Sequence, residues 1–241
     1  MSRAILITGA GARVGRFLAK ALAADGWAVA VHYNRSQVGA DTLVREIIEQ
    51  GGIAAAVQGN LFVPQDLDGL VARAAKALGQ PLTALINNAS TFEDDTARDF
   101  TRASYDYHMD INLRAPVMLA QQLAAQLPKD EIGCIINMID QRVLSPDPSF
   151  FTYSMSKSAL HWATQTLAQS LAPHIRVNAI GPGPTLKSHM QTPEEFSAEA
   201  GSTLLGTGSP PESLLEAARY LLSATSVTGQ MIAVDGGQHL S

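Results

Sequence analysis

The chain has 241 residues, of which 46% are hydrophobic and 16% are charged, and its formal net charge is -5. This composition argues against disorder, and no apolar run is long enough to cross a bilayer. The acidic balance leaves no basic stripe for a nucleic-acid backbone, so neither nucleic acid nor a membrane is an expected partner. Because the first strand-like run begins at Ala4 and no targeting segment is visible before it, we expect a cytoplasmic protein.

Short apolar runs alternate with helical patterns along the whole chain. Strands are predicted near residues 4–8, 27–33, 53–58, 82–87, 132–138, 175–180 and 230–234, and helices near 13–25, 37–50, 65–78, 101–127, 151–172 and 211–223. Runs such as Ala4-Ile5-Leu6-Ile7 are continuously apolar, which is typical of a parallel sheet covered on both faces. The sequence therefore predicts an α/β fold, a single-domain doubly wound Rossmann-type sheet of about seven parallel strands spanning residues 1–241.

One stretch breaks this alternation. Between Gly181 and Pro211, prolines and glycines accumulate between a predicted strand and the last predicted helix. Ligands of doubly wound sheets bind beyond the carboxyl ends of the strands, which is the edge that this stretch follows. We interpret residues 184–208 as a mobile lid over the substrate.

The sequence gives little reason to expect a metal site or a disulfide. Cys134 is the only cysteine and lies in an apolar run, where a buried small hydrophobic residue is expected. A disulfide within the chain is therefore impossible. The histidines other than His32 have no metal-like spacing, and no acidic cluster replaces them, so no metal is expected.

Residues 8–15 read TGAGARVG, a glycine-rich turn between the first predicted strand and helix. Gly9, Gly11 and Gly15 allow backbone N–H groups and the helix dipole to face a pyrophosphate. Arg13 stands where the second glycine of the usual dinucleotide turn is found. Its guanidinium can hold a second acidic or planar group in the same cleft, so we expect it to contact both cofactor and substrate.

The end of the second predicted strand indicates which dinucleotide binds. A site for NAD usually has an acidic residue there to hold the ribose hydroxyls, but residues 29–36 contain none. Arg35 and Ser36 instead offer a cation and a hydroxyl for a 2′-phosphate. The sequence therefore predicts NADPH rather than NADH.

Tyr153 and Lys157 are four residues apart in a predicted helix, so their side chains share one face. A nearby ammonium is expected to lower the pKa of the tyrosine and to make it a proton donor or relay. Pro116 has no N–H to donate to the carbonyl of Asn112, which frees that carbonyl for a water molecule and kinks the helix. The alternative is a proline merely tolerated in a bent helix.

Four features follow one another along the chain: TGAGARVG, Asn87-Asn88-Ala89, Asn112 and Tyr153-Ser-Met-Ser-Lys157. Their order is typical of the short-chain dehydrogenases/reductases, and they carry a resemblance to that family that runs almost from end to end. The resemblance implies that Asn112, Tyr153 and Lys157 are catalytic and that the cofactor is a nicotinamide dinucleotide. Asn60 stands where many members carry an aspartate near the adenine. The cofactor-binding residues expected are Gly9, Arg13, Val14, His32, Asn34, Arg35, Ser36, Asn60, Leu61, Asn88, Ala89, Lys157, Pro182 and Gly183.

Asp140 departs from the family pattern, which places a serine after the fifth strand to donate a hydrogen bond to a substrate carbonyl. An ionised carboxylate cannot donate, and it repels the oxyanion formed when a ketone is reduced. In an apolar cleft its pKa rises, which lets Asp140 act as an acid or pass a proton through Tyr153 to a ring nitrogen. This chemistry suits reduction of a C=N bond. The alternative is that Asp140 only caps a loop.

Four segments resemble those of one branch of the family, the pteridine reductases and dihydromonapterin reductases: the arginine-containing turn, residues 32–36, residues 87–92 and the aspartate at position 140. The C-terminal residues 227–230 and 235–240 fit the same branch. The resemblance implies that a pterin lies between the nicotinamide and Phe92, although Phe92 taken alone is also consistent with an ordinary loop residue. The substrate-binding residues expected are Arg13, Ser90, Phe92, Asp140, Phe150 and Tyr153.

The leading hypothesis is therefore an NADPH-dependent reductase of a pteridine ring C=N bond. Dihydrobiopterin and dihydromonapterin are the expected substrates, with dihydrofolate as a further candidate. One alternative is an NADPH-dependent carbonyl reductase of the 3-oxoacyl type, and another is a non-catalytic dinucleotide-binding sensor. The resemblance also implies a homotetramer built through the predicted helices 101–127 and 151–172.

Overall fold

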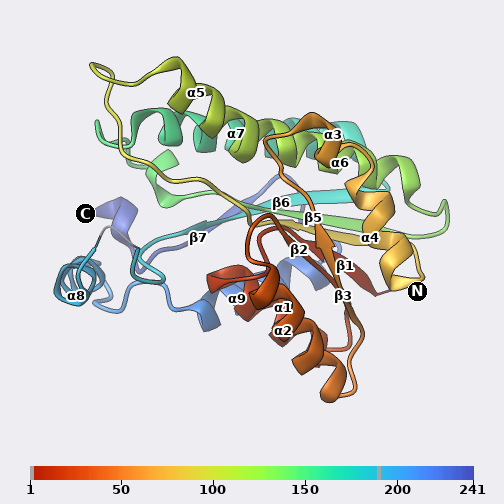
Figure 1. Ribbon diagram of the computed structural model, residues 1–241. Coiled ribbons are helices and arrows are strands. Elements are labelled where there is room, and N and C mark those ends of the chain that lie inside the picture. The colour runs from red at the N-terminus through yellow and green to blue at the C-terminus, as the bar shows by residue number, and fades with distance from the viewer. Residues whose placement is uncertain (1–2, 189–190) are drawn as a thin grey trace.

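The computed structural model describes residues 3–188 and 191–241, and its centre is a seven-stranded parallel sheet (Figure 1). The strand order is β3-β2-β1-β4-β5-β6-β7, and every neighbouring pair is parallel. The prediction of a doubly wound sheet is confirmed. The strands are β1 (Ala4–Ile7), β2 (Ala28–Tyr33), β3 (Ala54–Gln58), β4 (Ala84–Asn87), β5 (Gly133–Met138), β6 (Ile175–Pro182) and β7 (Met231–Val234).

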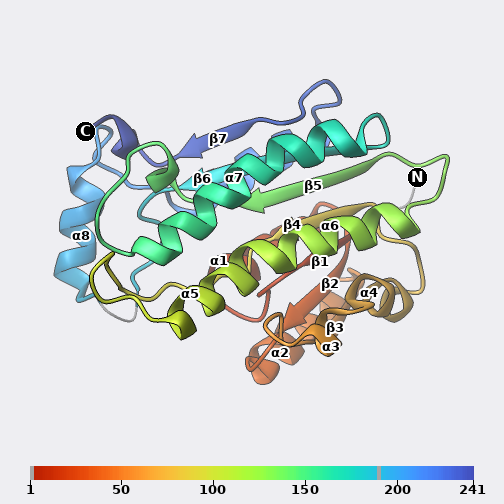
Figure 2. The same cartoon turned by 90° about the horizontal axis from the view of Figure 1, so that it is seen from above.

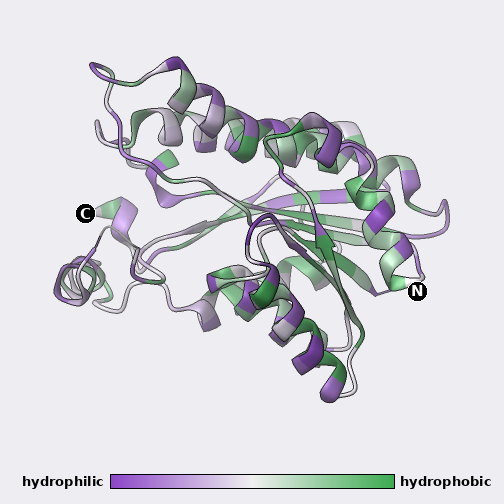
Figure 3. Cartoon of the chain, viewed as in Figure 1, coloured by the Kyte–Doolittle hydropathy of each residue, from purple (hydrophilic) through white to green (hydrophobic). Residues whose placement is uncertain are grey.

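Helices cover both faces of the sheet (Figures 1 and 2). One face carries α1 (Arg13–Ala24), α2 (Gln37–Glu49) and α9 (Pro211–Ser223), and the other carries α4 (Leu70–Leu78), α6 (Ala115–Gln126) and α7 (Phe151–Leu171). Each layer has its own buried core against the strands. Because the central strands are buried from both sides, most of their positions are apolar, as in β1, whose four residues are all apolar and buried (Figure 3).

Two predicted helices are interrupted. The predicted helix 65–78 is divided into α3 (Pro64–Leu67) and α4, because Gly69 between them adopts a left-handed backbone conformation with a φ of 67°. The predicted helix 101–127 consists of α5 (Arg102–Met109), a π-helical turn over Asp110–Arg114, and α6. The irregularity expected at Pro116 is thus a π-helical turn immediately before it.

The predicted lid segment, residues 184–208, contains a helix that the sequence analysis did not predict. Helix α8 (Pro193–Ser202) begins with a capping box in which the Thr192 side chain accepts from the Glu195 N–H and Glu195 accepts from the Thr192 N–H. The segment also includes residues 189–190, which lie outside the described residues.

Within residues 3–188 and 191–241, no helix has the length and apolar character needed to span a membrane. The same residues contain no group of three or more His, Cys, Asp or Glu side chains arranged to hold a metal ion. Cys134 is buried as predicted, and burial raises the pKa of its thiol to about 11.

Candidate active site

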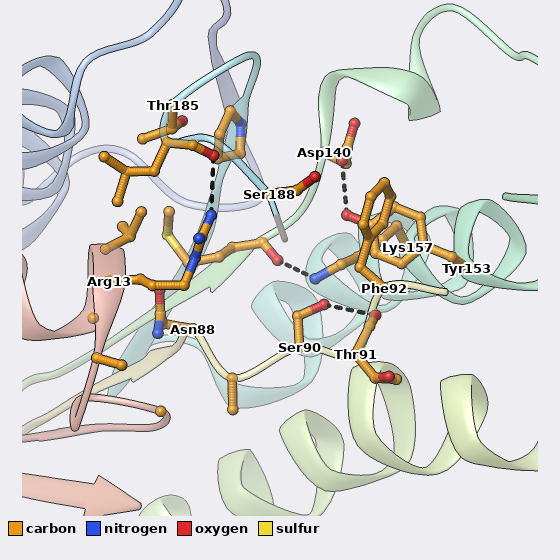
Figure 4. Close-up of a pocket in the computed structure, with 18 of the residues that line it drawn as sticks. Arg13, Asn88, Ser90, Thr91, Phe92, Asp140, Tyr153, Lys157, Thr185 and Ser188 are labelled. Carbon is orange, nitrogen blue, oxygen red and sulfur yellow. Dashed lines mark hydrogen bonds between the residues drawn. The ribbon is translucent and has the colours of Figure 1, made fainter. Parts of the chain in front are cut away.

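A cleft of about 990 Å³ opens at the carboxyl ends of the strands, where the turns after β1 and β4 lie side by side and the lid segment faces them (Figure 4). The strand order reverses at β1, so this is the crevice in which doubly wound sheets bind ligands. Every residue predicted to bind cofactor or substrate lines the cleft, and Asn112 is the one predicted catalytic residue that does not.

The glycine-rich turn packs closely against the segment after β4. A Cβ atom added at Gly15 would lie 2.5 Å from the Gly9 carbonyl oxygen and from the Asn88 side chain, so no larger residue fits there. Helix α1 begins directly after the turn without a side-chain cap and without an acidic residue in its first turn. Ala12 and Val14 line the cleft at this point, so the N-terminus of the helix presents uncompensated N–H groups to an anion.

His32 holds this turn in place. Its Nδ1 atom accepts a hydrogen bond from the Gly9 N–H, so Nε2 carries the proton and donates to the Gly59 carbonyl. Burial lowers the pKa of His32 to about 4, which keeps the ring neutral. Both ring nitrogens are therefore used by the backbone, so His32 lines the cleft while it holds the turn, and its predicted contact with the cofactor remains a prediction.

Arg13 connects the glycine-rich turn to the lid segment. Its guanidinium donates hydrogen bonds to the carbonyls of Leu186 and Lys187, at 3.0 and 2.8 Å, and Figure 4 shows one of the two. Arg13 also has a left-handed φ of 50°, an uncommon conformation for a residue with a side chain. No sequence pattern predicts this contact with the lid, and the contacts of Arg13 with cofactor and substrate remain predictions.

At the far end of the cleft, Asn34, Arg35 and Ser36 follow β2 and are exposed. Asn60 and Leu61 lie opposite them, after β3. The Asn60 side chain accepts a hydrogen bond from the Phe62 N–H, which fixes the start of that loop. This end of the cleft therefore has a cation and a hydroxyl available on the surface.

At the other end, the Tyr153 hydroxyl donates a hydrogen bond of 2.7 Å to Asp140 (Figure 4). The second carboxylate oxygen of Asp140 accepts from the Arg142 N–H at 2.9 Å. Lys157 is buried one helical turn after Tyr153 and donates to the Met138 carbonyl at 2.8 Å. The predicted group of Asp140, Tyr153 and Lys157 is thus assembled from the end of β5 and the first turns of α7.

The surroundings raise two pKa values and lower a third. Desolvation raises the pKa of the Asp140 carboxyl, as predicted. Burial and the neighbouring Asp140 raise the pKa of the Tyr153 phenol well above its ordinary value, so the prediction that Lys157 lowers it is wrong. Burial also lowers the pKa of Lys157 to about 8. Tyr153 therefore keeps its proton and is a hydrogen-bond donor at neutral pH.

Asn112 lies behind the cleft and is fully buried. Its side-chain oxygen accepts from the Ser90 hydroxyl and the Thr91 N–H, and its amide donates to the Thr91 carbonyl and to Ser156. The side chain therefore fixes the segment after β4 rather than contacting the cleft. Only its backbone carbonyl, for which Pro116 has no N–H, is left for the predicted water relay.

Three aromatic rings meet beside Asp140. The ring of Phe92 stacks on that of Phe150 with centroids 4.2 Å apart and stands edge-on to that of Tyr153, with centroids 4.7 Å apart. The Arg142 guanidinium lies 5.1 Å above Phe150. The cleft therefore has an apolar, flat-sided wall next to its proton-donating group.

Several cleft residues were not predicted. They come from the lid helix and from loops whose positions depend on tertiary packing. The Thr-Pro-Glu-Glu run at 192–195 was the one available signal for the lid helix. The residues missed include Asp94, Gln141, Arg142, Glu195, Phe196 and Glu199.

Comparison with known proteins agrees with this geometry. The chain is similar to the FolM alternative dihydrofolate reductase 1 of Brucella suis in complex with NADP, with 43% identity, a TM-score of 0.95, and coverage of 98% of this chain and 95% of that one. It is 36% identical to an uncharacterized oxidoreductase of Methylorubrum extorquens over 96% of both chains. It is 31% identical to a 3-oxoacyl-[acyl-carrier-protein] reductase of Synechocystis over 96% of this chain and 95% of that protein.

The family model described as short chain dehydrogenase matches residues 3–197, which include the glycine-rich turn, Asp140, Tyr153 and Lys157. With that match, and with a cleft at the switch point of a doubly wound sheet, the chain belongs to the short-chain dehydrogenase family of oxidoreductases.

Proposed function

We propose that this protein is an NADPH-dependent reductase of a C=N bond in a pteridine ring. The observation that carries the proposal is the hydrogen bond between Tyr153 and Asp140, in the position where ketone reductases of the family have a serine. The similarity to the Brucella suis dihydrofolate reductase, whose substrate contains a pteridine ring, supports the same conclusion.

The cleft residues fit NADPH. The uncapped N-terminus of α1 and the small residues of the glycine-rich turn suit a pyrophosphate. Arg35 and Ser36 suit a 2′-phosphate, and no acidic residue in β2 competes for the ribose hydroxyls. NADPH supplies the hydride when it is bound. Ser90 and Pro182 line the part of the cleft between these residues and Tyr153.

The substrate end suits a flat, polar heterocycle. Phe92 offers one aromatic face, and the donors and acceptors of Ser90, Asp140 and Tyr153 lie around it. Arg13 donates two of its five guanidinium N–H groups to lid carbonyls, which leaves others for a ligand oxygen or nitrogen. In this proposal, residues 184–208 act as a lid that Arg13 tethers.

The proton reaches the ring nitrogen from Tyr153. Because the raised pKa values of Tyr153 and Asp140 favour their neutral forms, the phenol donates its proton and Asp140 replaces it. Lys157, fixed on the Met138 carbonyl, lies beneath the tyrosine ring. The carbonyl of Asn112 holds the water that resupplies the relay. A ketone is a poorer substrate in this proposal, because Asp140 is hydrogen-bonded to Tyr153 and stands where a serine would donate to the developing oxyanion.

We also propose that the protein is a homotetramer. Trp162 and Met155 are 68% and 39% exposed on α7, seven residues apart and therefore on one helix face. A second copy would cover this face and the neighbouring surface of α5 and α6.

The substrate proposal is tested by following NADPH oxidation by the purified protein. The substrates are 7,8-dihydrobiopterin, dihydromonapterin, dihydrofolate and a β-ketoacyl thioester, with NADH as the cofactor control. We expect turnover of at least one dihydropteridine and little of the thioester. Turnover of the thioester alone would favour the activity named for the Synechocystis relative, and absence of turnover with every substrate would favour a non-catalytic binder.

A further inference from the structure

The N-terminus of α7, which carries Tyr153, is capped by a distant loop. The Phe150 N–H donates to the Asp94 side chain at 3.2 Å, and the Phe151 N–H donates to the Asp95 carbonyl at 2.9 Å. The Thr152 N–H donates to the Asp95 side chain at 2.9 Å. No side chain directly before the helix caps its first N–H groups. Two carboxylates from the segment after β4 accept hydrogen bonds from these groups instead.

A chain of buried hydrogen bonds continues from this cap. His108 on α5 accepts from the Glu93 N–H through Nε2, so its proton is on Nδ1. Nδ1 donates to the Thr152 hydroxyl at 2.7 Å, and that hydroxyl donates to Asp95. These hydrogen bonds require α5 to lie against α7, as it does in both ribbon views (Figures 1 and 2).

The direction of each bond follows from which atoms carry a hydrogen, from the Glu93 N–H at one end to the Asp95 carboxylate at the other. Burial lowers the pKa of His108, which keeps the imidazole neutral. Burial opposes ionisation of Asp95, but the hydrogen bonds from Thr152 and Ser104 outweigh it and lower the pKa of that carboxyl. His108 and Thr152 are 0% exposed and Asp95 is 8% exposed. Loss of the Thr152 hydroxyl would therefore leave the buried His108 N–H without its acceptor and would take one of three hydrogen-bond donors from the Asp95 carboxylate, which keeps those of the Thr152 N–H and Ser104.

We propose that Asp95, His108 and Thr152 are positioning residues that set the spacing between the Phe92 ring and the Tyr153 hydroxyl. Thr152 immediately precedes Tyr153, and Glu93, whose N–H begins the chain, immediately follows Phe92. The two rings that the chain holds are 4.7 Å apart, and Figure 4 shows them side by side at the substrate end. None of the three positioning residues lines the cleft, so they act only through Phe92 and Tyr153.

Thr152→Val tests the proposal, because valine keeps the shape of threonine and removes the shared hydroxyl. Thr152→Ser restores the hydroxyl. The matched control is Thr164→Val on the same helix, since Thr164 is also buried and its hydroxyl accepts from Asn137 and donates to the Leu160 carbonyl. For each variant, the kinetic constants for 7,8-dihydrobiopterin, the dissociation constant of NADPH and the thermal midpoint Tm are measured.

Misplacement of a reacting group by a fraction of an ångström lowers the rate strongly, so we expect kcat/KM to fall at least ~10-fold in Thr152→Val. We expect Thr152→Ser and Thr164→Val to stay within ~2-fold of the wild type, and the dissociation constant of NADPH to change by less than ~2-fold in all three. Thr164→Val is expected to lose a similar amount of Tm, because it also leaves buried polar groups unpaired.

A Thr152→Val protein that loses Tm but keeps its kinetic constants would overturn the proposal, as would an equal kinetic loss in Thr164→Val. If Thr152→Val does not fold, Asp95→Asn serves instead, because it keeps the side-chain shape and weakens the acceptor. Wild-type kinetics in Asp95→Asn would then overturn the proposal. The inference rests on the proposed function of Phe92 and Tyr153, whose failure would appear separately as a wild-type protein that reduces no dihydropteridine.

Discussion

The hydrogen bond between Tyr153 and Asp140 joins two acids whose pKa values are both raised by their surroundings. Each group favours its neutral form for a different reason: desolvation dominates for Asp140, whereas Tyr153 is both buried and next to a carboxylate. A raised pKa favours the form of each acid that carries a proton. This is the property that a reductase needs when the product is a ring N–H rather than an alcohol.

Lys157 gives a stability prediction. Its pKa is lowered from 10.5 to about 8 in the folded protein, so between these values the unfolded chain holds a proton that the folded protein has released. The free energy of unfolding therefore rises with pH across this window. Below the window both states are protonated, so Lys157 adds nothing to the pH dependence there. Relative to Lys157→Met, the free energy of unfolding of the wild type rises by up to about 3 kcal/mol between the bottom and the top of the window.

Urea unfolding of the wild type and of Lys157→Met at about pH 7.5 and about pH 9.5 measures this difference. We expect the wild type to gain stability relative to the variant between the two values. Equal changes in both proteins would show that the buried ammonium has an ordinary pKa.

Arg35 gives a prediction about the cofactor. Removing its guanidinium takes away the cation proposed to bind the 2′-phosphate, so Arg35→Ala is expected to raise the dissociation constant of NADPH ~10-fold and to leave that of NADH unchanged. Arg45→Ala, which removes an exposed cation from α2, is the control. An unchanged affinity for NADPH in Arg35→Ala would remove the basis for the cofactor choice.

The position of the cleft residues at one edge of the sheet could be predicted from the sequence, because each follows a predicted strand and the carboxyl ends of parallel strands share one edge. The sequence did not reveal their electrostatics. A four-residue spacing puts Tyr153 and Lys157 on one helix face, but it cannot show that Lys157 donates to a carbonyl of β5 or that Asp140 accepts from Tyr153. The predicted pKa of Tyr153 was wrong for this reason, whereas that of Asp140 was right because desolvation depends mainly on the cleft.

At the scale of elements, the π-helical turn over Asp110–Arg114 separates two regular helices directly behind the site. In this turn the Ala115 N–H donates to the Asp110 carbonyl, five residues back, and Pro116 offers no N–H at the next position. The turn therefore depends on the proline, and it leaves the carbonyl of Asn112 available for the proposed water.

Pro116→Ala is predicted to lower kcat about 10-fold without lowering Tm, because the new N–H can bond the Asn112 carbonyl and regularise the helix. Pro211→Ala, which changes a proline in the first turn of α9, is the control. An unchanged kcat in Pro116→Ala would mean that the proline is merely tolerated in an irregular helix.

The elements that the sequence failed to predict share a physical cause. Helix α8 has a weak apolar pattern, and none of its residues is buried, so only its capping box marked it. The break at Gly69 depends on a left-handed backbone conformation that many glycines of this chain adopt and others do not, so the residue type alone does not predict it. The hydrogen bonds that run from Glu93 through His108 and Thr152 to Asp95 join segments far apart in the sequence, and no local pattern indicates such contacts.

At the scale of the whole molecule, the exposed face of α7 is the basis of the proposed tetramer. Trp162→Glu would place a charge in that apolar face, so we expect the wild type to sediment as a tetramer and the variant as a smaller species. Val38→Glu is the control, since Val38 is 81% exposed on α2. A monomeric wild type, or an unchanged assembly in Trp162→Glu, would contradict the proposal.

The measurement that tests the central claim most directly is kcat/KM for 7,8-dihydrobiopterin and for a β-ketoacyl thioester in the wild type, in Asp140→Ser and in the isosteric Asp140→Asn. We expect both variants to lose ~100-fold or more with the dihydropteridine, because the acid behind Tyr153 is gone. We expect Asp140→Ser to reduce the thioester at least as well as the wild type, since serine can donate to an oxyanion. An Asp140→Ser protein that keeps its dihydropteridine activity would contradict the account.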